Sequence, residues 1–187
     1  MEAIEAIRTR RSIGKLTGDV SDAELQTLVD AALCAPNHRL TAPWRFTALR
    51  EDARARLGTL WAELVTTTST PLPDVDPADL FNKEARKPMR APLLLVVSTR
   101  TAADPVVAAE DFAATAAATQ NVLLAAHALG LAAIWRTGAM AYSTAVKAFL
   151  DLEATDRIVA IVYLGRPAMN PPLPRPRDSG TVLRTLR

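Results

Sequence analysis

The sequence predicts one domain in which α-helices and β-strands are mixed, with four or so strands among five or six helices. Two observations lead to this class. Continuous apolar runs at residues 93–98 and 158–164 have the pattern of strands buried on both faces. Longer segments with helical spacing and helix-capping residues separate such runs. At 187 residues a second independent domain would be cramped. We therefore expect a single domain over residues 1–187, with a proline-rich C-terminal extension from about residue 167.

Local signals set the ends of the predicted helices. Ser21 and Glu24 match a capping box, in which each side chain bonds the main-chain N–H of the other residue, and Pro36 ends that helix. Asp104-Pro105 suits the first turn of another helix, which Gly130 closes in the left-handed cap position. In chain order, the expected helices cover residues 2–9, 21–35, 51–65, 78–86, 104–130 and 143–150, and the expected strands cover residues 44–49, 93–98, 131–135 and 158–164.

Two proline-rich stretches predict neither helix nor central strand. Residues 66–77 hold three prolines with several Thr and Asp residues, which indicates a surface loop or lid. Residues 167–176 are too rich in proline for a helix or a central strand, and we expect them to be extended.

One uncharged stretch is long enough to cross a bilayer, because residues 112–135 contain no Asp, Glu, Lys or Arg. It is mostly alanine, however, and includes Asn121 and His127, whose polar groups would need partners in lipid. We interpret it as part of a helix buried on all sides within protein. That interpretation requires something to cover so long a helix in so small a domain.

Composition excludes several classes of protein. Hydrophobic residues make up 49% of the chain and charged residues 22%, which is globular rather than disordered. The net charge is +2 with a pI of about 9.0, and the basic residues form no stripe of the kind that binds nucleic acid. Cys34 is the single cysteine, so no internal disulfide can form and a reducing compartment is favoured. The first residues include two acids and no apolar run, so we expect a cytoplasmic protein without a signal peptide.

Several common catalytic sites are missing from the sequence. It contains no phosphate-binding G-x-x-x-x-G-K, no dinucleotide fingerprint after a strand and no G-x-S-x-G elbow. His38 and His127 lie far apart, with no Cys or carboxylate at metal-ligand spacing. A metal site, a metal hydrolase and a serine hydrolase are therefore not expected.

Three segments carry residues that suit a ligand. The first is Thr9-Arg10-Arg11-Ser12, whose two guanidinium groups and hydroxyls suit a phosphate dianion. A solvated basic helix end is the simpler interpretation of that segment alone. The second is Ala35-Pro36-Asn37-His38, followed by Thr41-Ala42-Pro43-Trp44, which is either a pinned loop that presents polar groups or a plain turn. The third is Ile134-Trp135-Arg136-Thr137-Gly138, where an apolar strand ends in donor-rich residues or simply leaves the core.

Taken together, these segments resemble one family. A helix that ends R-R-S, then A-P-N-H followed by P-W, then G-L-x-x-I-W-R-T-G, then Y-L-G-x-P is similar to the nitroreductase family. The likeness extends to its small subgroup of single-domain NAD(P)H nitroreductases and covers residues 3 to about 176 in order and spacing. It implies an α+β fold with a central mixed or antiparallel sheet surrounded by helices, in an intertwined homodimer with FMN at the interface.

The resemblance also implies roles for individual residues, all of them in cofactor binding. Arg10, Arg11 and Ser12 would hold the FMN phosphate and ribityl chain, and His38 would reach the flavin from the other subunit. The remaining implied cofactor residues are Trp135, Arg136 and Thr137 beside the ring, Gly138 for close main-chain approach, Arg166 as a further phosphate contact, and Cys34 where relatives can have an arginine that reaches the flavin. Residues 125–130 match a stretch associated with the nicotinamide cofactor. Ala42 stands where the family often has glutamine.

The implied chemistry belongs to the cofactor rather than to a catalytic side chain. Flavin N5 would accept hydride from NADH or NADPH, and a nitroaromatic, quinone or similar electrophile would then replace the nicotinamide. This is a ping-pong scheme without an obligatory acid–base residue. A flavin dehalogenase or oxidase on the same scaffold, a flavin-storage protein without turnover, and a basic nucleic-acid-binding module are the alternatives.

Overall fold

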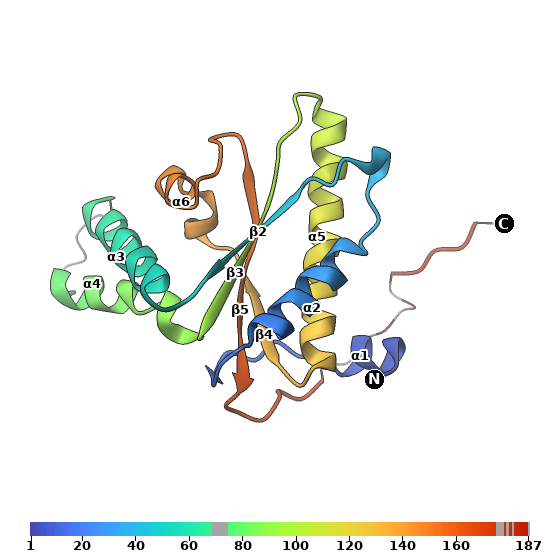
Figure 1. Ribbon diagram of the computed structural model, residues 1–187, viewed down its shortest axis with the longest axis horizontal. Helices are drawn as coiled ribbons and strands as arrows, with labels where there is room; N and C mark the ends of the chain where they lie inside the picture. Colours follow the sequence, from blue (N-terminus) through green and yellow to red (C-terminus); the bar gives the residue numbers. More distant parts are fainter. Residues whose placement is uncertain (69–74, 175–177, 179, 181, 187) are drawn as a thin grey trace.

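A five-stranded sheet lies between two groups of helices in the computed structural model (Figure 1). The structure describes residues 1–68, 75–174, 178, 180 and 182–186. The strands are β1 (Leu16–Thr17), β2 (Trp44–Leu49), β3 (Leu93–Thr99), β4 (Ala132–Arg136) and β5 (Arg157–Pro167). The α-helices are α1 (Ala3–Thr9), α2 (Asp22–Leu33), α3 (Glu51–Thr68), α4 (Pro77–Ala85), α5 (Pro105–Ala128) and α6 (Thr144–Phe149), and the 3-10 turns are η1 (His38–Leu40), η2 (Pro88–Arg90) and η3 (Ala139–Tyr142). The expected α+β class is confirmed.

β5 is the central strand of the sheet because the same part of it pairs on both edges. Leu164 lies opposite Leu93 of β3 and also opposite Ala133 of β4. β2 adds to the far edge of β3, and the two residues of β1 pair with the end of β5. All four ladders are antiparallel, so the sheet is not the mixed one that the expectation allowed, although Ser12 forms one isolated parallel bridge with Ala133.

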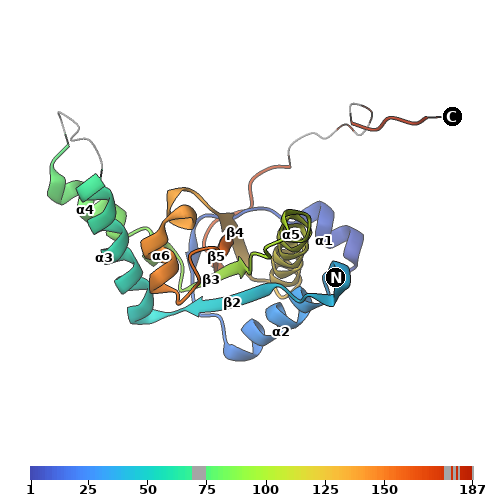
Figure 2. The same ribbon diagram turned by 90° about the horizontal axis from the view of Figure 1, so that it is seen from above.

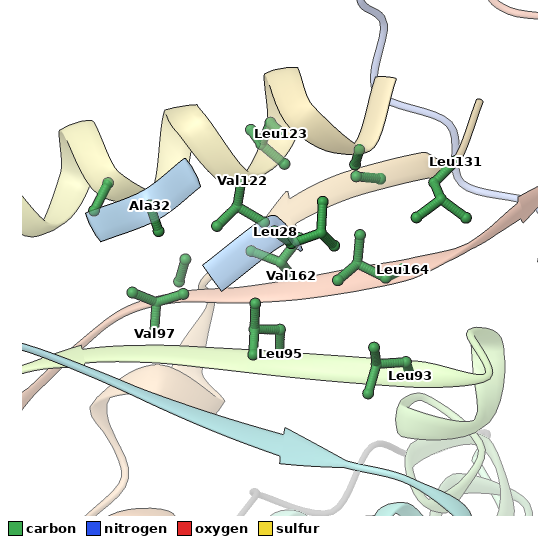
Figure 3. Packing of buried hydrophobic residues seen from close by; sticks show 14 of the residues in the cluster. Leu28, Ala32, Leu93, Leu95, Val97, Val122, Leu123, Leu131, Val162 and Leu164 are labelled. Atoms are coloured by element: carbon green, nitrogen blue, oxygen red, sulfur yellow. The ribbon is translucent and has the colours of Figure 1, made fainter. Parts of the chain in front are cut away.

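Side chains from alternate positions of the strands enter two separate cores. Leu93, Leu95 and Val97 of β3 pack with α2 and α5, as Figure 3 shows for one side of the sheet. Leu94 and Val96 point the other way, into the core closed by α3 and α6. Figure 2 shows these two helix groups on either side of the sheet. This arrangement explains why the sequence of β3 has no alternation of apolar and polar residues.

Most of the expected elements are confirmed, and the differences are local. The capping box is present, with the Glu24 N–H donating to Ser21 Oγ and the Ser21 N–H to the Glu24 carboxylate. β1 was not expected, since two residues are too few for a sequence pattern. The predicted loop over residues 66–77 is narrower, because α3 continues to Thr68 and α4 begins at Pro77; residues 69–74 lie outside the described residues. Residues 168–174 form no helix or strand, as expected, but Pro167 was wrongly placed outside the sheet, because β5 continues past residue 164 to pair with β1. Residues 175 and 176 lie outside the described residues.

The long uncharged helix is buried on one face and not on all sides. Ala118, Val122 and Ala126 of α5 are fully buried against the sheet and α2, whereas Ala113 and Ala128 are exposed. Small alanines let α5 lie close to its neighbours, and the exposed ones leave an apolar strip that this chain alone does not cover. Within the described residues, no helix combines the length and apolarity that crossing a membrane requires.

A glycine fixes the distance between α3 and the end of α4. A Cβ added to Gly58 would lie 2.2 Å from the main-chain oxygen of Ala85, nearer than two unbonded atoms can approach. Only glycine therefore permits this close crossing of the two helices. The same crossing sets where the chain leaves α4 for η2 and β3.

Replacing Gly58 with alanine should destabilise the fold. The new methyl group must push the Ala85 carbonyl away, and overpacking of this kind costs about 1–3 kcal/mol. Urea denaturation of Gly58→Ala measures the loss. Gly14→Ala is the matched control, because nothing lies within 4 Å of a Cβ at Gly14. Equal loss of stability in both variants would contradict the steric argument.

Candidate functional site

β4 presents the third predicted segment at the edge of the sheet. Ala133 and Trp135 pack on the α2 and α5 side, and Trp135 Nε1 donates to the Val159 carbonyl at 3.2 Å. Ile134 belongs to the opposite core, and the Arg136 guanidinium lies 5.6 Å from the centre of the Tyr163 ring. Trp135 and Arg136 therefore act on opposite faces of the sheet, although the sequence places them side by side.

The chain turns sharply where β4 ends. Gly138 has φ 65° and ψ −172°, a conformation that residues with a Cβ rarely adopt. No atom of the residues that the structure describes lies within 4 Å of the position a Cβ would take at Gly138. The main chain at Gly138 is thus unobstructed on that side, and the cofactor role that the family resemblance implies for it stays a prediction.

Main-chain contacts bring the first predicted segment to β4. The Ile13 N–H donates to the Ala133 carbonyl at 3.3 Å, and Ser12 bridges to the same residue. Ala133 and Arg136 are three residues apart on the strand, so Ser12 lies about 10 Å from the level of Arg136. Two of the three predicted segments therefore meet at one sheet edge.

The arginines of the first segment lie at the end of α1. Arg11 Nη1 donates to the carbonyls of Arg8 at 2.7 Å and of Arg10 at 2.8 Å, as expected of a basic group that satisfies a helix C-terminus. Thr9 Oγ1 is hydrogen-bonded to His127 Nε2 at 2.8 Å. Arg11, Thr9 and His127 also border an 840 Å³ cavity beside residues 167–171. The Arg11 guanidinium therefore both caps the end of α1 and borders a cavity where a phosphate could bind.

The second predicted segment lies elsewhere in the chain. His38 Nδ1 is 2.8 Å from Glu110 Oε2, near the start of α5, whereas Thr9 contacts His127 near its end. Those two positions on α5 are about 25 Å apart at about 1.5 Å per residue. Among the described residues that line the cavities at Arg11 and Arg136, His38 does not appear. One chain therefore does not bring His38 to the other two segments.

The loop that carries His38 is strained. Arg39, Leu40 and Ala42 all have positive φ, of 58°, 53° and 42°, which is uncommon for residues with a side chain. Thr41 Oγ1 donates to the buried Asp111 carboxylate at 2.6 Å and ties the loop to α5. Leu40 is 87% exposed. Strain of this kind is held only where surrounding contacts over-determine it, and it concentrates at functional sites.

Arg136 opens onto a positively charged cavity of about 360 Å³ that the sequence only partly predicted. We call this the β4 cavity. The expected residues Arg136, Thr137 and Gly138 line it, together with Ala139, Met140, Ile161, Trp61, Lys87, Arg90 and Tyr163. Lys87 and Arg90 were missed. Lys87 precedes the η2 turn and Arg90 ends it, just before a buried strand, and a Lys-Pro-Met-Arg run at that point was the available signal in the sequence.

Electrostatics in the β4 cavity act on Tyr163. Burial raises the pKa of the Tyr163 hydroxyl, and the charges of Arg136 and Arg90 lower it by a smaller amount. The phenol therefore stays neutral at physiological pH. Its pKa also depends on the charges of Arg136 and Arg90, which share the cavity with it.

Two further predicted residues have other partners in the structure. Arg166 Nη2 pairs with Glu24 Oε1 at 2.8 Å, so the capping-box carboxylate of α2 holds its guanidinium. Exposed Cys34 donates weakly to the Asp30 carbonyl at 3.5 Å and borders an apolar groove between α1, α2 and α5. Neither residue is among those that line the β4 cavity. Their cofactor roles stay predictions.

Known proteins show the same arrangement over most of the chain. The family model described as "Nitroreductase family" matches residues 7–166, from α1 to β5. The Bacillus subtilis (strain 168) protein named "Putative NAD(P)H nitroreductase YfhC" is 32% identical over 165 residues, which cover 87% of this chain and 83% of that protein. A nitroreductase-like family protein from Bacillus cereus superimposes with a TM-score of 0.85 at 24% identity, covering 100% of this chain and 96% of the other. A crystal structure described as a "putative nitroreductase in complex with fmn" from Desulfovibrio desulfuricans superimposes with a TM-score of 0.70 at 26% identity, covering 98% and 96%.

Removing a guanidinium from the β4 cavity should raise the pKa of Tyr163 further. The chain has two tyrosines, so a Tyr142→Phe background leaves Tyr163 as the only phenol. In that background Arg136→Met removes a charge that favours the phenolate, and phenolate absorbance should appear at higher pH. Arg157→Met is the control, because Arg157 lies over Phe112 instead. An unchanged titration in Arg136→Met would show that Arg136 does not act on the cavity.

Proposed function

This chain belongs to the nitroreductase family, and on that basis we propose that it is an FMN-dependent NAD(P)H oxidoreductase acting on a nitroaromatic, quinone or similar small electrophile. The observation that carries the proposal is the β4 cavity. There, Arg136, Thr137 and Gly138, which the family resemblance singled out, meet Lys87 and Arg90 beside aromatic walls. A flat aromatic ring that gains negative charge on reduction and has a phosphate-bearing tail suits such a cavity.

The residues present fit FMN in this position. The ring would lie in the β4 cavity, where the main chain at Gly138 is open to it. The ribityl chain and phosphate would follow the β4 edge toward Arg10, Arg11 and Ser12, because the Ile13 and Ser12 contacts with Ala133 place that segment alongside the strand. The Desulfovibrio desulfuricans relative, described as bound to fmn, supports the choice of cofactor.

The chain itself supplies position and charge. When bound, FMN would take up hydride from NAD(P)H and pass it to the electrophile. Lys87, Arg90 and Arg136 would favour the negative charge that the ring gains on reduction, since opposite charges attract strongly in a partly buried site. Tyr163 stays neutral through the working pH range, because burial raises its pKa. The proton that the reduced electrophile takes up would come from solvent, so no side chain of this set needs to supply one.

We propose that the working unit is a homodimer that shares each site between two chains. His38 is held by Glu110 far from Thr9 and His127 along α5, so it would serve the site of the partner. The exposed strip of α5, together with Leu40, offers apolar surface that a second copy would cover. Contact with a second copy would then account for both the exposed apolar side chains of α5 and the strained loop that carries His38.

The first test separates recognition of the phosphate from recognition of the ring. Arg10→Met/Arg11→Met should weaken FMN binding roughly tenfold or more and leave riboflavin binding unchanged, because riboflavin has no phosphate. Flavin fluorescence quenching measures both affinities. Arg8→Met is the matched control, as Arg8 is an exposed arginine of the same helix end. If the wild-type protein bound neither flavin, the proposed function would be wrong. If the protein bound flavin but neither NADH nor NADPH bleached the flavin under anaerobic conditions, a storage protein would be indicated instead.

Mixing two defective variants tests whether each site is shared. His38→Ala and Arg10→Met/Arg11→Met should each lower NAD(P)H-dependent turnover. After co-refolding, each mixed dimer should contain one intact site, built from the arginines of one chain and His38 of the other. Turnover should therefore recover to well above either variant alone. Sites formed within single chains would give no recovery, and size-exclusion chromatography of the wild type should show a dimer.

A further inference from the structure

A buried carboxylate lies just behind the wall of the β4 cavity. Glu84, in the last turn of α4, is only 6% exposed. An ionised carboxylate in such a place is unfavourable unless it is paired and hydrogen-bonded. Trp61 Nε1 donates to Glu84 Oε2 at 2.8 Å, and the Lys87 ammonium contacts the same oxygen as an ion pair. The function proposed above makes no use of this acid.

Both partners of Glu84 line the β4 cavity, and Glu84 itself is not among the lining residues. The Glu84 carboxylate thus links the Trp61 indole on α3 to the Lys87 ammonium just before η2, because both donate to it. Lysine side chains have four rotatable bonds and lose rotamer freedom when they are fixed. One buried acceptor shared by two donors is a means of holding the ammonium at the cavity wall instead of in solvent.

The main chain around Glu84 is itself held in place. Gly58 and Trp61 are three residues apart and share one face of α3. Gly58 leaves room for the Ala85 carbonyl. Trp61 donates a hydrogen bond to the side chain of Glu84, the residue before Ala85. The end of α4 therefore meets α3 at two adjacent points, and the carboxylate has little freedom to move away.

The charge state of Glu84 fits this arrangement. Burial raises the pKa of Glu84, but hydrogen bonds from Lys87 and Trp61, with the charges of Lys87 and Lys83, outweigh burial and leave the pKa below its ordinary value. The carboxylate is therefore ionised at neutral pH. Lys87 therefore keeps its counter-ion at neutral pH.

We propose that Glu84 is a positioning residue that holds the Lys87 ammonium and the Trp61 indole against the β4 cavity, so that Glu84 controls flavin binding through Lys87. The inference rests on the proposed function, because it takes the flavin ring as the occupant of the cavity. It concerns the ring end of the site only. Glu84 should therefore affect FMN and riboflavin alike, unlike the arginines at the end of α1.

A double-mutant cycle tests the proposal on the flavin-loaded protein. Lys87→Met removes the ammonium and keeps the length of the side chain, so dissociation constants for FMN and riboflavin should both rise roughly tenfold. Glu84→Ala should give a similar rise, because Lys87 loses its anchor. Adding Glu84→Ala to Lys87→Met should then have little further effect. Glu84→Gln should rescue most of the affinity, since its amide oxygen can still accept from Trp61 and Lys87.

The midpoint potential of bound FMN gives a second measurement. Lys87→Met should shift it to more negative values, because it removes positive charge from beside the reduced ring. Glu84→Ala should shift it in the same direction, because the released Lys87 ammonium leaves the cavity wall for solvent, whereas the lost carboxylate lies farther from the ring, behind that wall. Glu63→Ala, an exposed acid on α3, is the matched control and should shift neither quantity. Thermal unfolding of each variant shows whether it remains folded. If Glu84→Ala does not, Glu84→Gln is decisive, because it keeps Lys87 at the wall but removes the carboxylate charge and should shift the potential to more positive values; an unchanged potential would overturn the inference.

The outcomes separate this inference from the proposed function. If the wild type binds no flavin, the proposed function fails and this inference fails with it. If the wild type binds FMN but Glu84→Ala leaves the affinity and potential unchanged, only the inference is overturned. Effects of Glu84→Ala and Lys87→Met that add in full would also overturn it, because they would show that the two residues act independently.

Discussion

The pairing of β4 with β5 is the constraint on which the rest of the candidate site depends. β4 is only five residues long and follows directly on α5, so its position is set by one ladder and by the end of one helix. Its other edge carries the contacts of Ser12 and Ile13 with Ala133. A register shift of one residue would exchange the faces of Trp135 and Arg136 and move the guanidinium out of the β4 cavity. The presence of Arg136 in the cavity is thus a consequence of sheet register.

The sequence predicted those parts of the fold whose causes are local. Ser21 and Glu24 cap α2 through contacts three residues apart, and the apolar run of β3 reflects burial on both faces. Lys87 and Arg90 were not predicted, because only the crossing of α3 and α4 brings them to Arg136. For Arg166 the sequence suggested a role but did not reveal the residue that it pairs with in the structure. Its segment suggested a phosphate contact, whereas a carboxylate far away in the sequence, Glu24, engages it in the structure.

The two ends of α5 organise different parts of the surface. His127 at one end contacts Thr9, close to the segment that follows β4, and Glu110 near the other end holds His38. A rigid helix of this length keeps the two groups apart within one chain. In the homodimer proposed above, a site that needs both would draw on two chains, with His38 reaching across from the neighbour. In a two-fold dimer, each copy provides both halves, and two identical sites follow from the symmetry.

Charge in the β4 cavity gives a physical reason for a buried acid beside it. Lys87, Arg90 and Arg136 are like charges in a partly buried space, and their mutual repulsion disfavours the cavity before any ligand binds. Arg136 offsets some of this by lying over the Tyr163 ring, and Glu84 offsets more by pairing with Lys87. Because Glu84 is behind the wall, it reduces the repulsion without filling the space that a ligand needs. The cavity can then remain net positive toward a ligand that carries negative charge while the folded chain tolerates three cations around it.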